Sequence, residues 1–151
     1  MKPIMQQSTL DFIALCEGFK SNPYTDGTGR WTIGIGFTTL NGQSVNASTP
    51  PMTLQEAESI LKDQVQQRAS FVSDHVTVSI NQNQYDAICD FTYNLGIESL
   101  LISELLKNIN AGLQVTQENF TDWDNQTVNG KLVKVEGLYD RRLKEFNLFN
   151  S

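Results

Sequence analysis

Cysteine, histidine and basic residues are scarce in this sequence. Its 151 residues include two cysteines and one histidine, with no CxxC motif, so neither a disulfide framework nor a Cys/His metal site is indicated. Lys and Arg number 11 against 17 Asp and Glu, and they form no block that would neutralise phosphates. We therefore expect no metal, no cofactor and no nucleic-acid partner.

Long hydrophobic runs are also missing. No segment approaches the roughly 20 apolar residues of a membrane-spanning helix. The first residues, MKPIMQQSTLDFIALCEGF, carry one lysine and no long apolar core before a small-residue cleavage site, so they lack the pattern of a signal peptide. We expect a chain that is made in the cytoplasm, without a signal peptide and without a membrane span.

The rest of the composition is that of an ordinary globular protein. Hydrophobic residues make up 39% and charged residues 19% of the chain, and a chain of this length buries roughly two-thirds of its unfolded surface. Because a core of that size is stable without a covalent cross-link, we expect Cys16 and Cys89 to be buried free thiols rather than a disulfide. The simplest expectation is one domain, residues 1–151, that works as a monomer.

The first helical pattern covers residues 8–19. Its apolar side chains lie on two opposite faces, with Leu10, Ile13 and Ala14 on one face and Phe12, Leu15, Cys16 and Phe19 on the other. A helix with two apolar faces has to be covered on both sides, so we predict a core helix here.

A different pattern follows at residues 21–49, where Gly, Asn, Thr and Ser dominate. The tetrapeptide DGTG is a strong turn signal. The next stretch, RWTIGIGFTT, alternates apolar residues with the period of a strand, at Trp31, Ile33, Ile35 and Phe37. We predict a small hairpin or a three-stranded sheet.

The remaining chain is predicted to be helical. Thr53 and Glu56 have the spacing of a capping box, which predicts the start of a long helix. Later helices end at Gly96 and Gly112, VNGK is a turn, and a last helix covers about 139–149.

These elements predict an α+β fold that is mainly α. A small β-rich lobe covers about residues 20–50, a linking helix about 53–73, and a larger helical lobe about 76–151 together with the N-terminal helix. The long helix joins the two lobes.

Two acids flank the turn in CEGFKSNPYTDGTGRWTIGIGFTT. Glu17 follows an apolar helical stripe at a helix C-terminus, where desolvation and the helix dipole both disfavour the anion, as suits a general acid. Asp26 lies in a polar turn that favours the ionised form. Enzymes that cleave a glycosidic bond use two carboxyls, one in surroundings that favour the protonated form and one in surroundings that favour the anion. The Thr32 hydroxyl could hold the attacking water.

A plain structural interpretation also fits these three residues. Glu17 could be a surface acid at a helix end, Asp26 a turn residue and Thr32 a strand former. Spacing alone leaves both interpretations open.

The motifs resemble those of the phage-type lysozymes, the endolysin or muramidase family of the T-even and lambdoid phages. In that family Glu, eight residues, Asp, five residues and Thr form the catalytic set, and Glu17, Asp26 and Thr32 match this spacing without a gap. NQNQYDAICDFTYNLG and EGLYDRRLKEFNLF are similar to two further family motifs, so the resemblance spans nearly the whole chain.

The resemblance implies a lysozyme-like bilobal fold and a function. The implied activity is hydrolysis of the β-1,4 bond between N-acetylmuramic acid and N-acetylglucosamine in peptidoglycan, with inversion at the anomeric carbon and without metal or cofactor. It also implies that Arg141 reaches Glu17, although Glu145, four residues further along the helix, is another partner for Arg141. Tyr24, beside the turn, is a candidate for lining the sugar cleft.

Two other functions remain open at this point. A lytic transglycosylase cuts the same bond but needs no water held by a second carboxylate, so Asp26 and Thr32 favour hydrolysis. An inactive wall-binding module could keep the fold without the reaction.

Two biological settings fit an enzyme that acts on peptidoglycan in the periplasm or cell wall. One is a phage endolysin released through a holin, and the other is a bacterial effector injected into a rival and countered by an immunity protein.

Overall fold

Helix α3 is the centre around which the other helices pack. The computed structural model describes residues 2–151, and α3 contacts α1, α2, α4 and α7. Every α3 residue from 85 to 92 is buried, as expected of a helix that is covered all round. In chain order the helices are α1 (Gln7–Glu17), α2 (Leu54–His75), α3 (Gln82–Leu95), α4 (Ile97–Ile102), α5 (Glu104–Asn110), α6 (Gln117–Thr121) and α7 (Glu136–Phe149).

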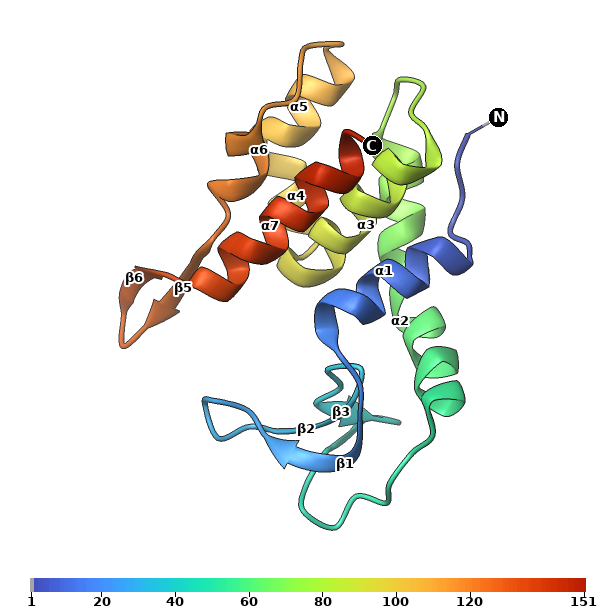
Figure 1. The fold of residues 1–151 in the computed structure, drawn as a ribbon, viewed down its shortest axis with the longest axis vertical. Coiled ribbons are helices and arrows are strands. Elements are labelled where there is room, and N and C mark those ends of the chain that lie inside the picture. The colour runs from blue at the N-terminus through green and yellow to red at the C-terminus, as the bar shows by residue number, and fades with distance from the viewer. Residues whose placement is uncertain (1) are drawn as a thin grey trace.

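The strands pair as short antiparallel ladders. β1 pairs with β2, β3 with β4 and β5 with β6, with Tyr24 opposite Thr32 in the first ladder. Their bounds are β1 (Lys20–Thr25), β2 (Trp31–Gly34), β3 (Thr39–Leu40), β4 (Gln43–Ser44), β5 (Asn125–Val128) and β6 (Lys131–Lys134). The first four strands form a small part below the helices, whereas the β5–β6 hairpin extends from the helical part (Figure 1).

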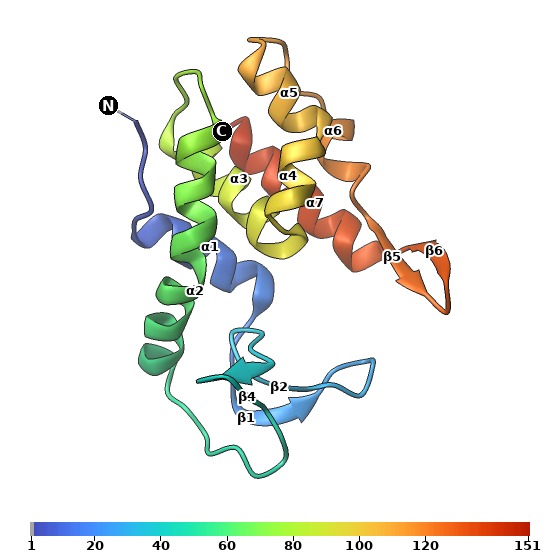
Figure 2. The same cartoon turned by 180° about the vertical axis from the view of Figure 1, so that it is seen from behind.

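Helix α2 connects the two parts. Thr53 caps it, because the Thr53 hydroxyl accepts from the Glu56 backbone N–H at 3.1 Å while the Glu56 carboxylate accepts from the Thr53 N–H at 3.0 Å. The predicted capping box is therefore confirmed. Seen from behind, α2 runs from the helical part down towards the loop that leads to β4 (Figure 2).

One apolar cluster runs through both parts of the molecule. Ile33, Phe37 and Met52 from the β part belong to the same core as Leu61 and Ile88 from the helices. The two parts are therefore packed against each other and not merely tethered, and this arrangement fixes the end of α1 above β1 and β2.

The structure corrects two sequence predictions near the candidate site. Leu15 is 69% exposed, so α1 is covered on one face only and not on both. The predicted strand alternation through Phe37 is also wrong, because β2 ends at Gly34 and the chain turns back to pair Phe37 with Ile33. The apolar residues remain buried because a tight turn keeps them on the core side.

The last helix and the hairpin before it also differ from the prediction. Helix α7 begins at Glu136, three residues before the predicted start at Tyr139. The predicted VNGK turn is present at Asn129–Gly130, but it joins β5 and β6, two strands that the sequence pattern did not indicate. All eight residues of these strands are exposed, so they lack the apolar alternation that marks a half-buried strand.

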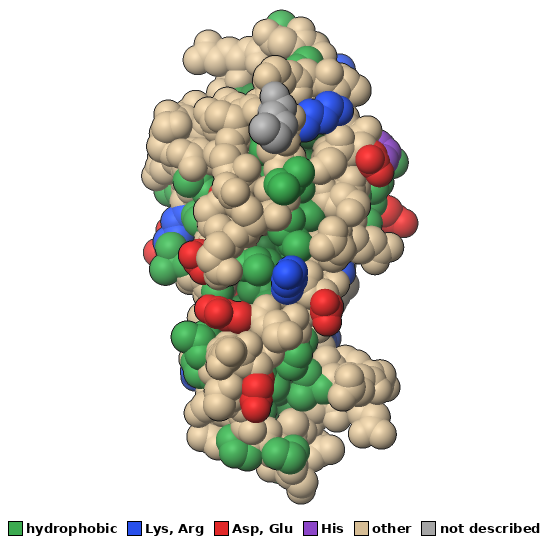
Figure 3. Space-filling view, turned by 90° about the vertical axis from the view of Figure 1, so that its right-hand side faces the viewer, with side chains coloured by type: hydrophobic (Ala, Val, Ile, Leu, Met, Phe, Trp, Pro, Cys, Tyr) green, Lys and Arg blue, Asp and Glu red, His purple; other side chains and the backbone are tan. Residues whose placement is uncertain are grey.

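Charged side chains of both signs lie on one face of the molecule (Figure 3). On the face shown in Figure 3, Lys and Arg lie scattered among Asp and Glu. Within residues 2–151, none of the helices has the length and apolar character that a bilayer crossing requires.

Candidate active site

Glu17 lies where the helical part meets the β part. It is the last residue of α1, and its side chain is 22% exposed. The carboxylate rests against the turn after β2, so closely that a Cβ built on Gly36 would lie 2.7 Å from Glu17 Oε2. Glycine at position 36 therefore leaves the space that this carboxylate occupies.

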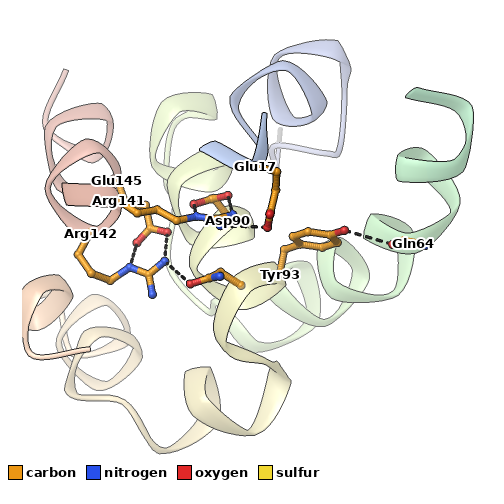
Figure 4. A network of polar contacts seen from close by, with 8 residues as sticks. Glu17, Gln64, Asp90, Tyr93, Arg141, Arg142 and Glu145 are labelled. Atoms are coloured by element: carbon orange, nitrogen blue, oxygen red, sulfur yellow. Dashed lines mark hydrogen bonds and ion pairs between the residues drawn. The ribbon is translucent and has the colours of Figure 1, made fainter. Parts of the chain in front are cut away.

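Arg141 on α7 holds the same carboxylate from the other side. Its Nη1 donates to Glu17 Oε1 at 2.9 Å, while its Nε and Nη2 donate to the two oxygens of Asp90 at 2.9 and 2.6 Å. The guanidinium thus bridges α1 and α3 (Figure 4). Its two bonds to Asp90 have the forked geometry that fixes the orientation of an arginine.

A second ion pair lies beside the first and is fully buried. Arg142 Nη2 donates to Glu145 Oε2 at 2.8 Å and to Asn94 Oδ1 at 2.9 Å. Its Nε lies 2.7 Å from Glu145 Oε1 without the alignment of a hydrogen bond, and its Nη1 has no partner among the described residues. The helix pair of α7 therefore forms between Arg142 and Glu145, not between Arg141 and Glu145.

The surroundings of the Glu145 carboxyl disfavour its ionised form. Burial raises its pKa well above the usual range, and the neighbouring carboxyl of Asp90 raises it further, against the opposing charges of Arg142 and Arg141. Asp90 and Glu145 are thus close enough to interact, which links the two ion pairs into one network.

Two further groups border Glu17. The Tyr93 hydroxyl donates to Gln64 Oε1 at 3.1 Å, and burial, followed by the charge of Glu17, raises the pKa of Tyr93 to about 12. Burial also raises the pKa of the Cys16 thiol to about 12. Both groups stay neutral at ordinary pH. Cys16 and Cys89 are free thiols, as predicted, but only Cys89 is buried, whereas Cys16 is half-buried.

Asp26 occupies the turn between β1 and β2. Its Oδ1 accepts three hydrogen bonds, from the Thr28 hydroxyl at 2.6 Å and from the backbone N–H groups of Thr28 and Arg30 at 2.8 and 2.9 Å. The Thr28 hydroxyl and the Arg30 N–H are the main reasons why the pKa of Asp26 lies below its usual range. Because all three bonds reach one oxygen, Oδ2 is left without a hydrogen bond from residues 2–151.

Thr32 and Tyr24 lie opposite each other on β2 and β1. Thr32 is 5% exposed, and its hydroxyl donates to the Arg30 carbonyl at 3.3 Å. Since the proton is used in that bond, the lone pairs of the hydroxyl remain available to accept from a water. Tyr24 is half-buried, and Lys20 Nζ lies 4.3 Å above its ring.

The sequence did not indicate every residue that surrounds the site. Arg141 contacts Glu17, whereas Asp90 and Gly36 were not singled out. A lone Asp within an apolar helical run gives a weak signal, because a buried carboxylate requires a partner that the local sequence does not show. A Gly pair flanking Ile35 gives a stronger signal, since close backbone approach is a common use of glycine in a strand.

The surroundings of the two carboxyls suit different tasks, acid catalysis for Glu17 and negative charge for Asp26. Glu17 is partly open to solvent and held in one orientation, and Asp26 is held ionised with one oxygen free. Such a pair of acids serves the cleavage of acetals and glycosides.

Comparisons with known proteins place the chain among phage lysozymes. The sequence model of the phage lysozyme family matches residues 14–145. The chain is 34% identical over 149 residues to an endolysin of Acyrthosiphon pisum secondary endosymbiont phage 1, covering 97% of this chain and 98% of the relative.

Solved structures agree as well. An endolysin from Escherichia coli O157:H7 phage FAHEc1 superposes with a TM-score of 0.90 at 33% identity, covering 99% of this chain and 96% of the other. The muramidase domain of SpmX from Asticaccaulis excentricus superposes with a TM-score of 0.78 at 27% identity, covering 99% of both.

Proposed function

Because the chain belongs to the phage lysozyme family, we propose that Glu17, Asp26 and Thr32 are the residues with which it cleaves its substrate. The protein is a muramidase, a glycoside hydrolase that cuts the β-1,4 bond between N-acetylmuramic acid and N-acetylglucosamine in peptidoglycan. The roles of individual residues follow from their surroundings.

Glu17 is the general acid that protonates the leaving sugar oxygen. The observation that carries this role is its position at the junction of the two parts, between Gly36 and Arg141, with 22% of the side chain open. A group that gives a proton to a substrate must reach it while being held in one orientation, and this side chain meets both conditions.

Asp26 supplies negative charge and directs water. The three hydrogen bonds to Oδ1 stabilise the carboxylate, and Oδ2 remains free to accept from a water or to face the positively charged sugar. A lowered pKa makes Asp26 a weak base but a reliable anion, so charge stabilisation of the oxocarbenium-like transition state is its larger contribution.

Thr32 helps to place the attacking water. Its hydroxyl already donates to Arg30, so it acts on the water as an acceptor. Attack by a water held by Asp26 and Thr32, on the face away from Glu17, gives inversion at the anomeric carbon. Tyr24, across the β1–β2 ladder from Thr32, lines the same side of the substrate.

The setting we propose is that of a phage endolysin, because the curated relatives bear that name. The chain would fold as one lysozyme-like unit and act as a monomer on the cell wall, after synthesis in the cytoplasm and release by a holin. An effector countered by an immunity protein is the alternative setting for the same chemistry.

The test of the acid is Glu17→Gln. The amide still accepts the bond from Arg141 but has no acidic proton to give, so lysis of purified peptidoglycan should fall at least about a hundredfold with the melting temperature little changed. The matched control is Glu58→Gln, at a glutamate on α2 that is half-buried as Glu17 is, which should lyse at the wild-type rate.

The products distinguish the competing functions. A reducing N-acetylmuramic acid end supports hydrolysis, whereas a 1,6-anhydro end would mean a lytic transglycosylase. Full activity of a folded Glu17→Gln variant would remove Glu17 from the reaction, and an inactive wild type that binds peptidoglycan would mean a wall-binding module.

A further inference from the structure

We propose that Asp90 is a positioning residue that neutralises Arg141, so that Glu17 can hold its proton until the substrate takes it. The inference rests on the proposed role of Glu17 as the general acid. Asp90 is 0% exposed on α3 and touches no substrate, so its effect must pass through Arg141.

The positive charge of Arg141 opposes protonation of a carboxyl at position 17. Its Nη1 lies 2.9 Å from Glu17 Oε1, and a positive charge at that distance favours the carboxylate over the protonated acid. Asp90 compensates this positive charge, because its two oxygens accept hydrogen bonds from Arg141 Nη2 and Nε at 2.6 and 2.9 Å. The pair is electrically neutral as a unit, and Glu17 receives an oriented N–H donor with little net charge behind it.

The net charge of the network of ion pairs also supports a protonated carboxyl within it. It contains three carboxyls, from Glu17, Asp90 and Glu145, and two guanidiniums, from Arg141 and Arg142. With every group ionised the network has one excess negative charge, and it is neutral when one carboxyl carries a proton. Neutrality is favoured in a low-dielectric interior.

Two carboxyls compete for that proton. Burial and the neighbouring carboxyl of Asp90 raise the pKa of Glu145, whereas Glu17 is the carboxyl that solvent and substrate can reach. Side-chain exposure is 22% at Glu17 and 0% at Asp90 and Glu145, and each of the buried two faces its own arginine at 2.8 Å or less. Glu17 is therefore the carboxyl of this network that can exchange a proton with the substrate. Asp90 is what makes the pair with Arg141 neutral.

Titratable and charged groups from each of the facing helices lie near Glu17, and only Asp90 pairs with Arg141 through two hydrogen bonds. Those on or near the facing elements are Arg141 and Glu145 on α7, Asp90 and Tyr93 on α3, Cys16 on α1, and Arg68 on α2, whose guanidinium lies 5.6 Å from the Tyr93 ring. Tyr93 and Cys16 are neutral, and Arg68 faces the Tyr93 ring and forms no ion pair with Glu17 within the described residues. The balance at Glu17 is therefore set mainly by Arg141 and Asp90.

The test measures the pH at which Glu17 loses its proton, by two readouts in each variant. One is the alkaline limb of the lytic rate, and the other is the titration of the 13C-labelled Glu17 carboxyl by NMR, which does not require activity. In Asp90→Asn the positive charge of Arg141 is no longer compensated, so both midpoints should move to lower pH by about one unit or more.

Two further variants separate charge from structure. In Arg141→Gln the cation is gone while Asp90 remains, so the midpoint should move to higher pH. In Asp90→Asn/Arg141→Gln two amides replace the pair without any charge, and the midpoint should return towards the wild-type value. A purely structural role predicts that the double variant is at least as impaired as either single variant and that the midpoints do not move in opposite directions.

The matched control is Asp86→Asn, one turn earlier on the same helix. Asp86 is also buried, but it accepts from Ser8 and Thr9, each at 2.6 Å, near the start of α1. Thr9 precedes Glu17 by eight residues, about 12 Å along the helix. This variant should lose stability and keep the wild-type midpoint.

The outcomes are distinct. A wild-type midpoint in folded Asp90→Asn overturns this inference and leaves the proposed function intact, provided that Glu17→Gln is inactive. If Asp90→Asn does not fold, Arg141→Gln and the double variant decide, and equal midpoints in those two overturn the inference. Full activity of Glu17→Gln would instead overturn the proposed function on which the inference rests.

Discussion

Gly36 leaves the space that the carboxylate of Glu17, the proposed acid, occupies, and Gly36→Ala is the most direct test of that contact. The new Cβ would lie 2.7 Å from Glu17 Oε2, whereas ordinary contact begins at 3.4 Å, so the carboxylate must withdraw by roughly 0.7 Å (3.4 − 2.7). Glu17 is a flexible side chain and can make this movement at little energetic cost. The fold should therefore tolerate the substitution better than the reaction does.

The two effects have separate magnitudes. Position 36 has φ +74°, and a non-glycine residue in that region costs about 1–2 kcal/mol, which lowers the melting temperature of a domain of this size by roughly 2–8 °C. A displacement approaching 1 Å at a reacting group can cost on the order of a hundredfold in rate. We expect the lytic rate to fall between about tenfold and a hundredfold.

Gly42→Ala is the matched control. Gly42 has φ +77°, almost the same backbone conformation, but nothing lies within 4 Å of the Cβ built there. Both variants should lose similar stability, and only Gly36→Ala should lose activity. The assay is the clearing of purified peptidoglycan below the melting transition of either variant, and equal rates in the two would refute the idea that Gly36 positions Glu17.

Two further predictions concern Asp26 and Thr32. Thr32→Val should reduce the lytic rate without loss of melting temperature, because valine is a good strand former that cannot accept a hydrogen bond from water. Thr32→Glu should instead trap a glycosyl group detectable by mass spectrometry or retain the anomeric configuration. Wild-type activity in Thr32→Val would mean that Thr32 is a strand residue only. Thr28→Val removes the main cause of the lowered pKa of Asp26, so that pKa rises, Asp26 takes up its proton at higher pH, and the acidic limb of the lytic rate should move to higher pH. An unmoved acidic limb would show that Asp26 does not need to be ionised.

The parts of the fold that the sequence predicted are those with local causes. The capping box of Thr53 and Glu56 closes within one helical turn, and Gly96 ends α3 as expected. A helix end and a polar turn made Glu17 and Asp26 candidates from a few local residues. Choosing them over plain structural roles required the resemblance of the motifs to the phage-type lysozymes.

The parts that sequence patterns missed depend on distant partners. Asp90 is buried only because Arg141, 51 residues further on, is available to neutralise it. Likewise, two apolar faces on α1 did not reveal that Leu15 would stay exposed, since that depends on which elements pack against the helix. Strand alternation failed beyond Gly34 because a tight turn and a continuous strand bury the same residues.

The pairing of Glu17 with Arg141 joins two residues that are synthesised far apart in time. Arg141 leaves the ribosome 124 residues after Glu17, a delay of roughly 6–25 s at 5–20 residues per second. During that time α1 lacks both the guanidinium that orients its carboxylate and helix α7, which covers α3. The surroundings of Glu17, the proposed acid, are therefore completed only after α7 has been made, and a chain terminated before α7 has the Glu17 motif without the ion pair that orients its carboxylate.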